Sequence, residues 1–201
     1  MKTPLSIFIL AFILLSFSQL ASSQVRIGAK AGIGLADENW DNFGGDVETK
    51  LIPVLMVGGV IEFDLSEYLS FGTGIQYQGK GTEVETFKTV MSYVQIPLQL
   101  QYTNNGFFGA VGPYYAFALS GKYKRDAGDI DLLFGSTEDD DFSSSDFGAN
   151  LEVGYEYEQI RVTASYSQGL ANIIPSDSRK LFDGSVKNVV FGVGLTYLFG
   201  E

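Results

Sequence analysis

Acidic side chains are the first candidates for chemistry in this sequence. Within the segment 37–52, four oxygen-bearing residues have the spacing of positions 1, 3, 5 and 12 of an EF-hand calcium loop: Asp37, Asn39, Asp41 and Glu48. Asn42 stands at the sixth position, where the sharp turn of such a loop requires glycine, and the flanking segments have strand character, not helix character. The match is incomplete, so these four residues are kept only as candidate calcium ligands.

A second set of charged residues falls on one face of the predicted strands and forms a candidate lumen charge network: Arg26, Lys30, Glu62, Asp64, Glu152, Glu156 and Arg161. Arg161 is within reach of Glu152 and Glu156, because a tight corner joins the two strands that carry them. The set has two interpretations, a polar conduit or proton path, and a plug of ion pairs. The interior of an eight-stranded barrel holds side chains but no wide channel, which favours the plug.

A third acidic group lies in the segment 123–146, which contains Asp126, Asp129, Asp131, Glu138, Asp139, Asp140, Asp141 and Asp146. Carboxylate oxygens bind hard cations and attract basic proteins. The segment therefore has two interpretations, a binding loop for divalent cations or a basic partner at the cell surface, and a solvated, mobile loop.

The composition excludes several classes of function. The chain has 201 residues, no histidine, no cysteine and a formal net charge of -11. Without cysteine there is no disulfide scaffold or thiolate metal site, and without histidine there is no imidazole catalysis. An acidic surface repels nucleic acid. Glu152 and Glu156 remain as an acid pair, but their inward position favours a structural role. We expect no enzyme and no cofactor.

The N-terminal segment predicts export. Residues 1–23 combine Lys2, an apolar run from Leu5 to Phe17, and small residues before Gln24. The apolar run is shorter than the ~20 residues that a membrane-spanning helix needs. We expect a signal peptide over 1–23, cleaved before Gln24, and a barrel domain over 24–201.

Alternation with a period of two dominates the rest of the chain, which indicates an all-β protein. About eight strands are expected, over 25–36, 53–64, 68–80, 90–103, 107–122, 147–158, 160–169 and 187–199. Tight turns at 65–67, 104–106 and 158–159 alternate with longer connections at 37–52, 81–89, 123–146 and 170–186. This arrangement is typical of a transmembrane up-and-down antiparallel β-barrel.

The composition of the two strand faces favours a membrane barrel over a soluble one. The polar face is rich in Gly, Ser and Gln, which suits a narrow interior. The apolar face carries tyrosines near strand ends, which suits interfacial girdles: Tyr68, Tyr77, Tyr93, Tyr102, Tyr155, Tyr157, Tyr166 and Tyr197.

Several segments resemble the small outer-membrane barrels often called PorT-like, within the OmpA/OmpX-type porin superfamily. They are Ser92–Leu98, Gly109–Tyr114, Asp146–Asn150 and Ser165–Ile173. The ending with Leu195, Tyr197 and Phe199 resembles the signal that barrel-assembly machinery recognises, although Gly200 and Glu201 follow it. The resemblance implies the outer membrane of a Gram-negative bacterium, with that machinery, membrane lipid and lipopolysaccharide as partners.

Three functions remain open at this stage. The first is a non-enzymatic outer-membrane protein, structural or surface-binding through external loops. The second is an accessory membrane component of a protein secretion or transport apparatus, with secretion-apparatus proteins as partners. The third is a soluble periplasmic ligand-binding barrel.

Overall fold

The alternating segments form nine strands in the computed structural model, which describes residues 24–43, 48–85, 87–125, 127–180 and 184–199. The expected signal peptide, residues 1–23, lies outside the described residues. The strands are β1 (Val25–Asp41), β2 (Ile52–Asp64), β3 (Leu69–Val84), β4 (Phe87–Asn104), β5 (Phe107–Lys124), β6 (Ile130–Asp131), β7 (Ser145–Tyr157), β8 (Ile160–Gly169) and β9 (Ser185–Phe199). A short 3-10 helix, η2, covers Ser178–Lys180.

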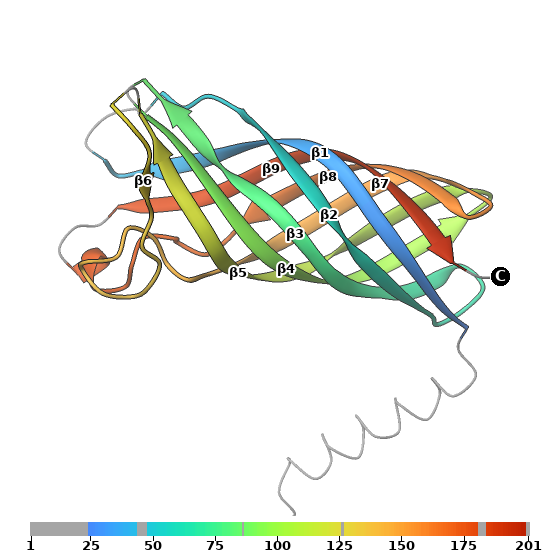
Figure 1. Ribbon diagram of the computed structural model, residues 1–201. Coiled ribbons are helices and arrows are strands. Elements are labelled where there is room, and N and C mark those ends of the chain that lie inside the picture. Colours follow the sequence, from blue (N-terminus) through green and yellow to red (C-terminus); the bar gives the residue numbers. More distant parts are fainter. Residues whose placement is uncertain (1–23, 44–47, 86, 126, 181–183, 200–201) are drawn as a thin grey trace, which may run out of the picture.

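Eight of these strands close into an antiparallel ring (Figure 1). Each strand pairs with the next along the chain, with β7 following β5, and β9 returns to pair with β1 from Ile27↔Phe199 to Asp41↔Ser185. The two-residue β6 adds only to the outer end of β5. Because the sheet is closed, the backbone N–H and C=O groups of the strands find hydrogen-bond partners on neighbouring strands, as a hydrocarbon environment requires. The predicted barrel of about eight strands is confirmed.

Connection lengths differ between the two ends of the barrel. The turns at one end are tight, and the ends of β1 and β9 that carry Val25 and Phe199 lie there too (Figure 1). Asn105 and Gly106 have φ values of 51° and 82°, the pair of positive values that a type I′ hairpin turn needs. At the other end, the connections 125–144 and 170–184 carry β6 and η2.

Two expected loops are shorter than predicted. β1 continues to Asp41, so the connection to β2 covers only 42–51. β3 ends at Val84 and β4 begins at Phe87, so the expected loop 81–89 is a tight hairpin. The strands β1, β3 and β4 extend past the apolar belt with polar residues. Above the membrane the backbone of a strand is still paired, but its side chains need not alternate between apolar and polar.

The outward face of the barrel is apolar, and the inward face holds the buried polar residues. Ile33, Leu55 and Phe191 are each at least half exposed, whereas Glu62 and Arg161 are buried inside. This inverted pattern is that of a membrane barrel. Tyr93 is a correction to the expected girdle: its side chain is fully buried in the lumen, on the same face as Gln95 and Gln99.

Candidate functional site

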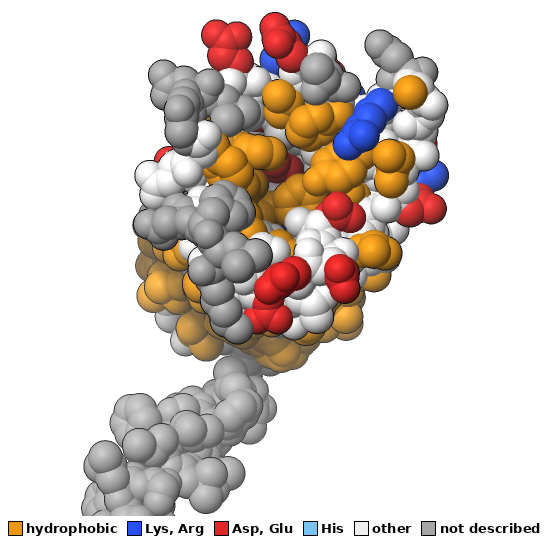
Figure 2. Space-filling view, turned by 90° about the vertical axis from the view of Figure 1, so that its left-hand side faces the viewer, with side chains coloured by type: hydrophobic (Ala, Val, Ile, Leu, Met, Phe, Trp, Pro, Cys, Tyr) orange, Lys and Arg blue, Asp and Glu red, His pale blue; other side chains and the backbone are white. Residues whose placement is uncertain are grey.

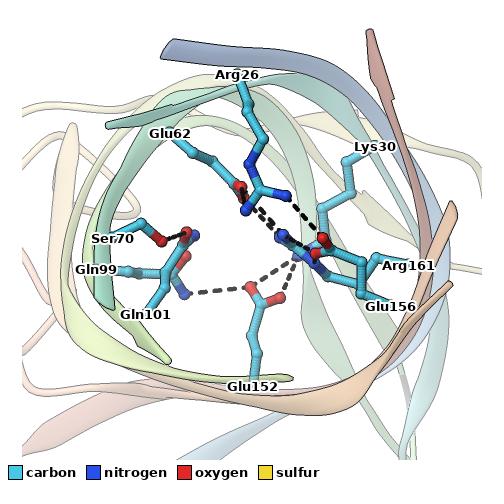
Figure 3. Close-up of polar contacts among 9 residues, drawn as sticks. All are labelled: Arg26, Lys30, Glu62, Ser70, Gln99, Gln101, Glu152, Glu156 and Arg161. Atoms are coloured by element: carbon cyan, nitrogen blue, oxygen red, sulfur yellow. Dashed lines mark hydrogen bonds and ion pairs between the residues drawn. The ribbon is translucent and has the colours of Figure 1, made fainter. Parts of the chain in front are cut away.

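Two arginines and two glutamates interlock inside the barrel (Figure 3). The register Arg26↔Glu62 and Glu156↔Arg161 places them in the half that bears the tight turns. Arg161 on β8 binds Glu62 on β2 with both terminal nitrogens, at 2.5 and 3.0 Å. It also donates to Glu156 on β7 from Nε at 2.8 Å. Arg26 on β1 bridges the same two acids, at 2.9 Å to Glu62 and 2.7 Å to Glu156. Each arginine thus contacts both acids, and the four groups tie four strands together.

A separate ion pair, between Lys30 and Glu152, lies next to these four residues. The Lys30 Nζ atom is 2.7 Å from each carboxylate oxygen of Glu152, and Gln99 Nε2 donates to the same group at 3.2 Å (Figure 3). The three cations and three acids give the network no net charge. Buried charges are tolerated when they are paired in this way, so the network can remain in the lumen without a bound counter-ion.

Asp64 is the one predicted network member that lies apart. Its side chain is half-buried at the end of β2, and no ion pair of Asp64 occurs among the described residues. It lines an open cavity of about 530 Å³ at this end of the barrel, together with Gln24, Arg26 and Tyr68. The structure therefore brings together six of the seven predicted charges, in strands that are far apart in the sequence.

A second polar cluster, which sequence reasoning missed, lies deeper in the lumen. Lys80 on β3 contacts Asp146 on β7 at 2.8 Å. Tyr114 and Asn188 donate to the same carboxylate oxygen at 3.2 and 3.0 Å, and the Lys80 ammonium lies 4.3 Å from the Tyr114 ring centroid. The alternation of Gln76, Gln78 and Lys80 predicts an inward lysine. The position of Asp146 is a correction, because the sequence predicts a loop over 123–146 whereas Asp146 lies in β7.

An apolar plug fills the lumen above this cluster, at the end with the long connections. We define the plug by four connection residues, Leu132, Phe142, Ile173 and Ile174, which are all buried and pack on Met91, Tyr93, Tyr114, Ala116 and Val186 of the wall. Backbone hydrogen bonds fix it: the Leu132 amide donates to Gly121, and the Ile173 amide to Val186, both at 2.9 Å. Figure 2 shows this apolar floor inside a rim with acidic side chains.

The candidate calcium ligands do not form an EF-hand loop. Asp37, Asn39 and Asp41 lie in the extended strand β1, so the chain does not curl around an ion there. Asp37 instead accepts hydrogen bonds from Thr82 Oγ1 at 2.6 Å and Thr49 Oγ1 at 3.3 Å, and Glu48 is exposed in the following connection. Within the described ranges, no three acidic side chains are grouped so as to hold a metal ion.

Apart from the buried Asp146 described above, the acidic segment 123–146 contains two kinds of carboxylate. Asp140 and Asp141 are used within the connection: Asp140 accepts from the Thr137 hydroxyl at 2.6 Å and its amide at 2.9 Å, and Asp141 from the Leu133 amide at 2.9 Å. The Thr137 hydroxyl and amide lower the pKa of Asp140 below its usual range. Asp129, Glu138 and Asp139 are exposed. Asp126 lies outside the described residues.

The residues of the expected assembly signal face outward on the last strand. Leu195, Tyr197 and Phe199 are 52%, 42% and 54% exposed on β9, and the Tyr197 hydroxyl donates to Gln159 Oε1 at 2.5 Å. The alternation of β9 puts all three on the apolar belt, between β8 and β1. Recognition by assembly machinery remains a proposal.

Comparisons with known proteins identify the class of this barrel. Residues 17–175 match the family described as outer membrane protein beta-barrel domain. The fold is similar to that of Ail, the attachment invasion locus protein of Yersinia pestis, with 11% identity, a TM-score of 0.51, and coverage of 88% of this chain and 99% of Ail. It is also similar to Neisserial surface protein A, with 9% identity, a TM-score of 0.53, and coverage of 89% and 99%. No curated protein sequence matches the chain.

These findings remove one of the three expected functions. A soluble periplasmic barrel is ruled out, because the family is one of outer-membrane barrels and the outward face carries exposed apolar side chains. Among the described residues, no helix is long and apolar enough to cross a membrane.

Proposed function

Because the chain belongs to the outer-membrane protein β-barrel family, we propose that it is a non-enzymatic protein that acts through its external connections while its lumen stays closed. The observation that carries this proposal is the filling of the interior at three levels. The ion-pair network, the Lys80–Asp146 cluster and the apolar plug follow one another along the lumen. Filling at these three levels would close the lumen to solutes and leave the external surface for function.

A non-enzymatic role agrees with the state of the inward acids. Glu152 is held by Lys30 and Gln99, and Glu156 by two arginines. A general acid or base needs a free position within reach of a substrate proton. Both carboxylates are instead occupied by fixed cations inside a filled lumen, which supports the structural role.

We assign a basic partner to the external surface. Asp129, Glu138 and Asp139 are exposed on the connection that contributes Leu132 and Phe142 to the plug. The plug holds this connection against the barrel, so its carboxylates are presented without a large cost of ordering the segment. A basic peptide or protein surface would therefore meet a partly fixed acidic rim (Figure 2).

Binding of an oligolysine peptide to the detergent-solubilised protein tests this function. The variant D129N/E138Q/D139N is expected to bind the peptide roughly fivefold more weakly at low salt, since three exposed charges are lost. The control E67Q/E158Q removes exposed carboxylates at the opposite end of the barrel and should keep nearly wild-type affinity. Equal weakening per carboxylate removed, three in the first variant and two in the control, would mean that only net charge matters, which contradicts the proposed loop surface.

A second candidate is an accessory role in a secretion or transport apparatus. The PorT-like segments Ser92–Leu98 and Ser165–Ile173 support it, and the barrel would then serve as a membrane anchor. Deletion of the gene should reduce the set of secreted proteins, and the D129N/E138Q/D139N chain should restore it if only the anchor is needed. Unchanged secretion after deletion would remove this candidate.

A further inference from the structure

Three lysines and one glutamate form a row across the outer ends of four neighbouring segments. Lys50 is the bridge partner of Glu83, Glu83 is opposite Lys88, and Lys88 is opposite Lys124. Directly opposite residues of antiparallel strands project from the same side of the sheet, about 5 Å apart. We call these four residues the lysine row, and its net charge is positive although the whole chain carries -11.

The lysine row places two like charges at directly opposite strand positions, and an anion would offset their repulsion. Lys88 and Lys124 are like charges directly opposite each other, which destabilises a sheet. No ion pair of Lys50, Lys88 or Lys124 is present in the part of the chain that the structure describes. The nearby Lys122 differs, because it lies 3.6 Å from Asp131. An anionic group seated between Lys88 and Lys124 would offset their repulsion.

The row lies beyond the edge of the apolar belt, at a height from which long lysine side chains can reach back to the headgroup layer of a membrane. The outward residues of β5 are apolar from Phe107 to Leu119, which are 55% and 58% exposed. Twelve residues of a tilted strand span roughly 30 Å, the thickness of a hydrocarbon core. Lys124 follows Leu119 by five residues and therefore lies about 13 Å beyond the belt edge.

At the same height, the outward residues of strand β1 are not basic. On β1, the outward residues above Leu35 are Asp37, Asn39 and Asp41. Below the row, Leu119 and Phe117 remain exposed on β5. A basic patch beyond an apolar surface on the same strands fits an amphipathic lipid, with phosphate above and acyl chains below.

We propose that the lysine row is a binding site for a phosphorylated glycolipid of the outer leaflet. The phosphate is held between Lys88 and Lys124 with support from Lys50, and the acyl chains lie along the outward face of β4 and β5. This site is separate from the acidic rim of the proposed function, so either can fail without the other.

Native mass spectrometry with bisphosphorylated lipid A tests the proposal on the detergent-solubilised protein. The variant K88Q/K124Q should bind about tenfold more weakly, because two charge-assisted contacts are lost. E83Q should bind more tightly, since it removes the only acid of the row, and misfolding would not strengthen binding. The matched control K187Q, a lysine on β9 across from Asn39, should bind like the wild type. A mobility shift on unboiled gels verifies that every variant is folded.

Two comparisons identify the ligand. Phosphate-free lipid A should bind the wild type about tenfold more weakly than the bisphosphorylated form, and the deacylated, phosphorylated disaccharide should not compete. The proposal is overturned if K88Q/K124Q binds like K187Q, if the phosphate-free lipid binds equally well, or if the deacylated disaccharide competes fully, since a soluble sugar phosphate would then be the ligand.

Discussion

Arg161 is the residue on which the most interactions of the lumen depend. Its guanidinium contacts Glu62 and Glu156 and stacks 3.8 Å from the Phe108 ring centroid. Removal of one partner of a buried pair leaves an uncompensated charge, which is more costly than replacement of the whole pair. The stability of the barrel therefore depends on both partners of these ion pairs being present.

Replacement of Arg161 should lower stability strongly. We expect Arg161→Met to reduce the free energy of unfolding by about 3–5 kcal/mol, because Arg26 alone then faces the buried Glu62 and the partly buried Glu156. Denaturant unfolding from lipid vesicles measures this change. Arg179→Met, at an exposed arginine, is the control and should change stability by less than about 0.5 kcal/mol. Equal small effects would mean that water or ions compensate for the network.

The turn around Thr137 should respond to pH through Asp140. The Thr137 hydroxyl and amide lower the pKa of Asp140, so the bonds stabilise the turn above the usual carboxyl pKa of about 4. That contribution is lost as the pH falls through the lowered pKa. In Thr137→Ala, NMR titration of the Asp140 carboxyl carbon should show a higher midpoint. Thr49→Ala, at a distant threonine, should leave the midpoint unchanged, and an unchanged midpoint in Thr137→Ala would contradict the assignment.

At the scale of elements, the external connections are fixed by the plug, not by their own secondary structure. The neighbours Leu132 and Leu133 offer a matched test, because they are 6% and 58% exposed. Leu132→Ala should weaken the docking of 125–144 by about 2–3 kcal/mol through a cavity, and Leu133→Ala should not. Limited proteolysis of the folded barrel measures the release as cleavage within this connection. Equal cleavage of both variants would show that the plug is not what holds it.

The strands could be predicted from the sequence because membrane barrels alternate over long stretches. Every predicted strand overlaps an observed one, and the tight turn at Asn105 and Gly106 was readable from residue types. The hairpin between Val84 and Phe87 was not, because polar residues above the membrane look like a loop in sequence. The plug was missed for a related reason: Leu132 and Ile173 lie in polar connections whose folding depends on the barrel mouth.

The lumen charges were partly predictable because strand residues alternate between the inward and the outward face. Strand parity placed Arg26, Lys30 and Arg161 on the inward face, but parity says nothing of height along the barrel. Asp64 shares the inward face with Glu62, but it lies beside the open cavity at the end of the barrel with the tight turns. It therefore remains outside the ion pairs. The partners of Lys80 depended on how β3 and β7 face each other across the lumen, which no local pattern contains.

At the scale of the whole molecule, the barrel is a filled cylinder with an apolar outer wall. Two polar layers and an apolar layer occupy the interior, and the sites we propose lie outside it, on the acidic rim and the lysine row. Because the proposed sites consist of surface carboxylates and lysines, they require neither histidine nor cysteine. It requires that ions do not pass through the lumen.

Single-channel recording in planar lipid bilayers tests this requirement most directly. If the ion-pair network and the plug close the lumen as we propose, the purified, heat-modifiable protein should insert without stable conductance steps. Reproducible steps from the wild-type barrel would contradict the account, because they would show that the lumen opens and that transport, not surface binding, is the activity to pursue.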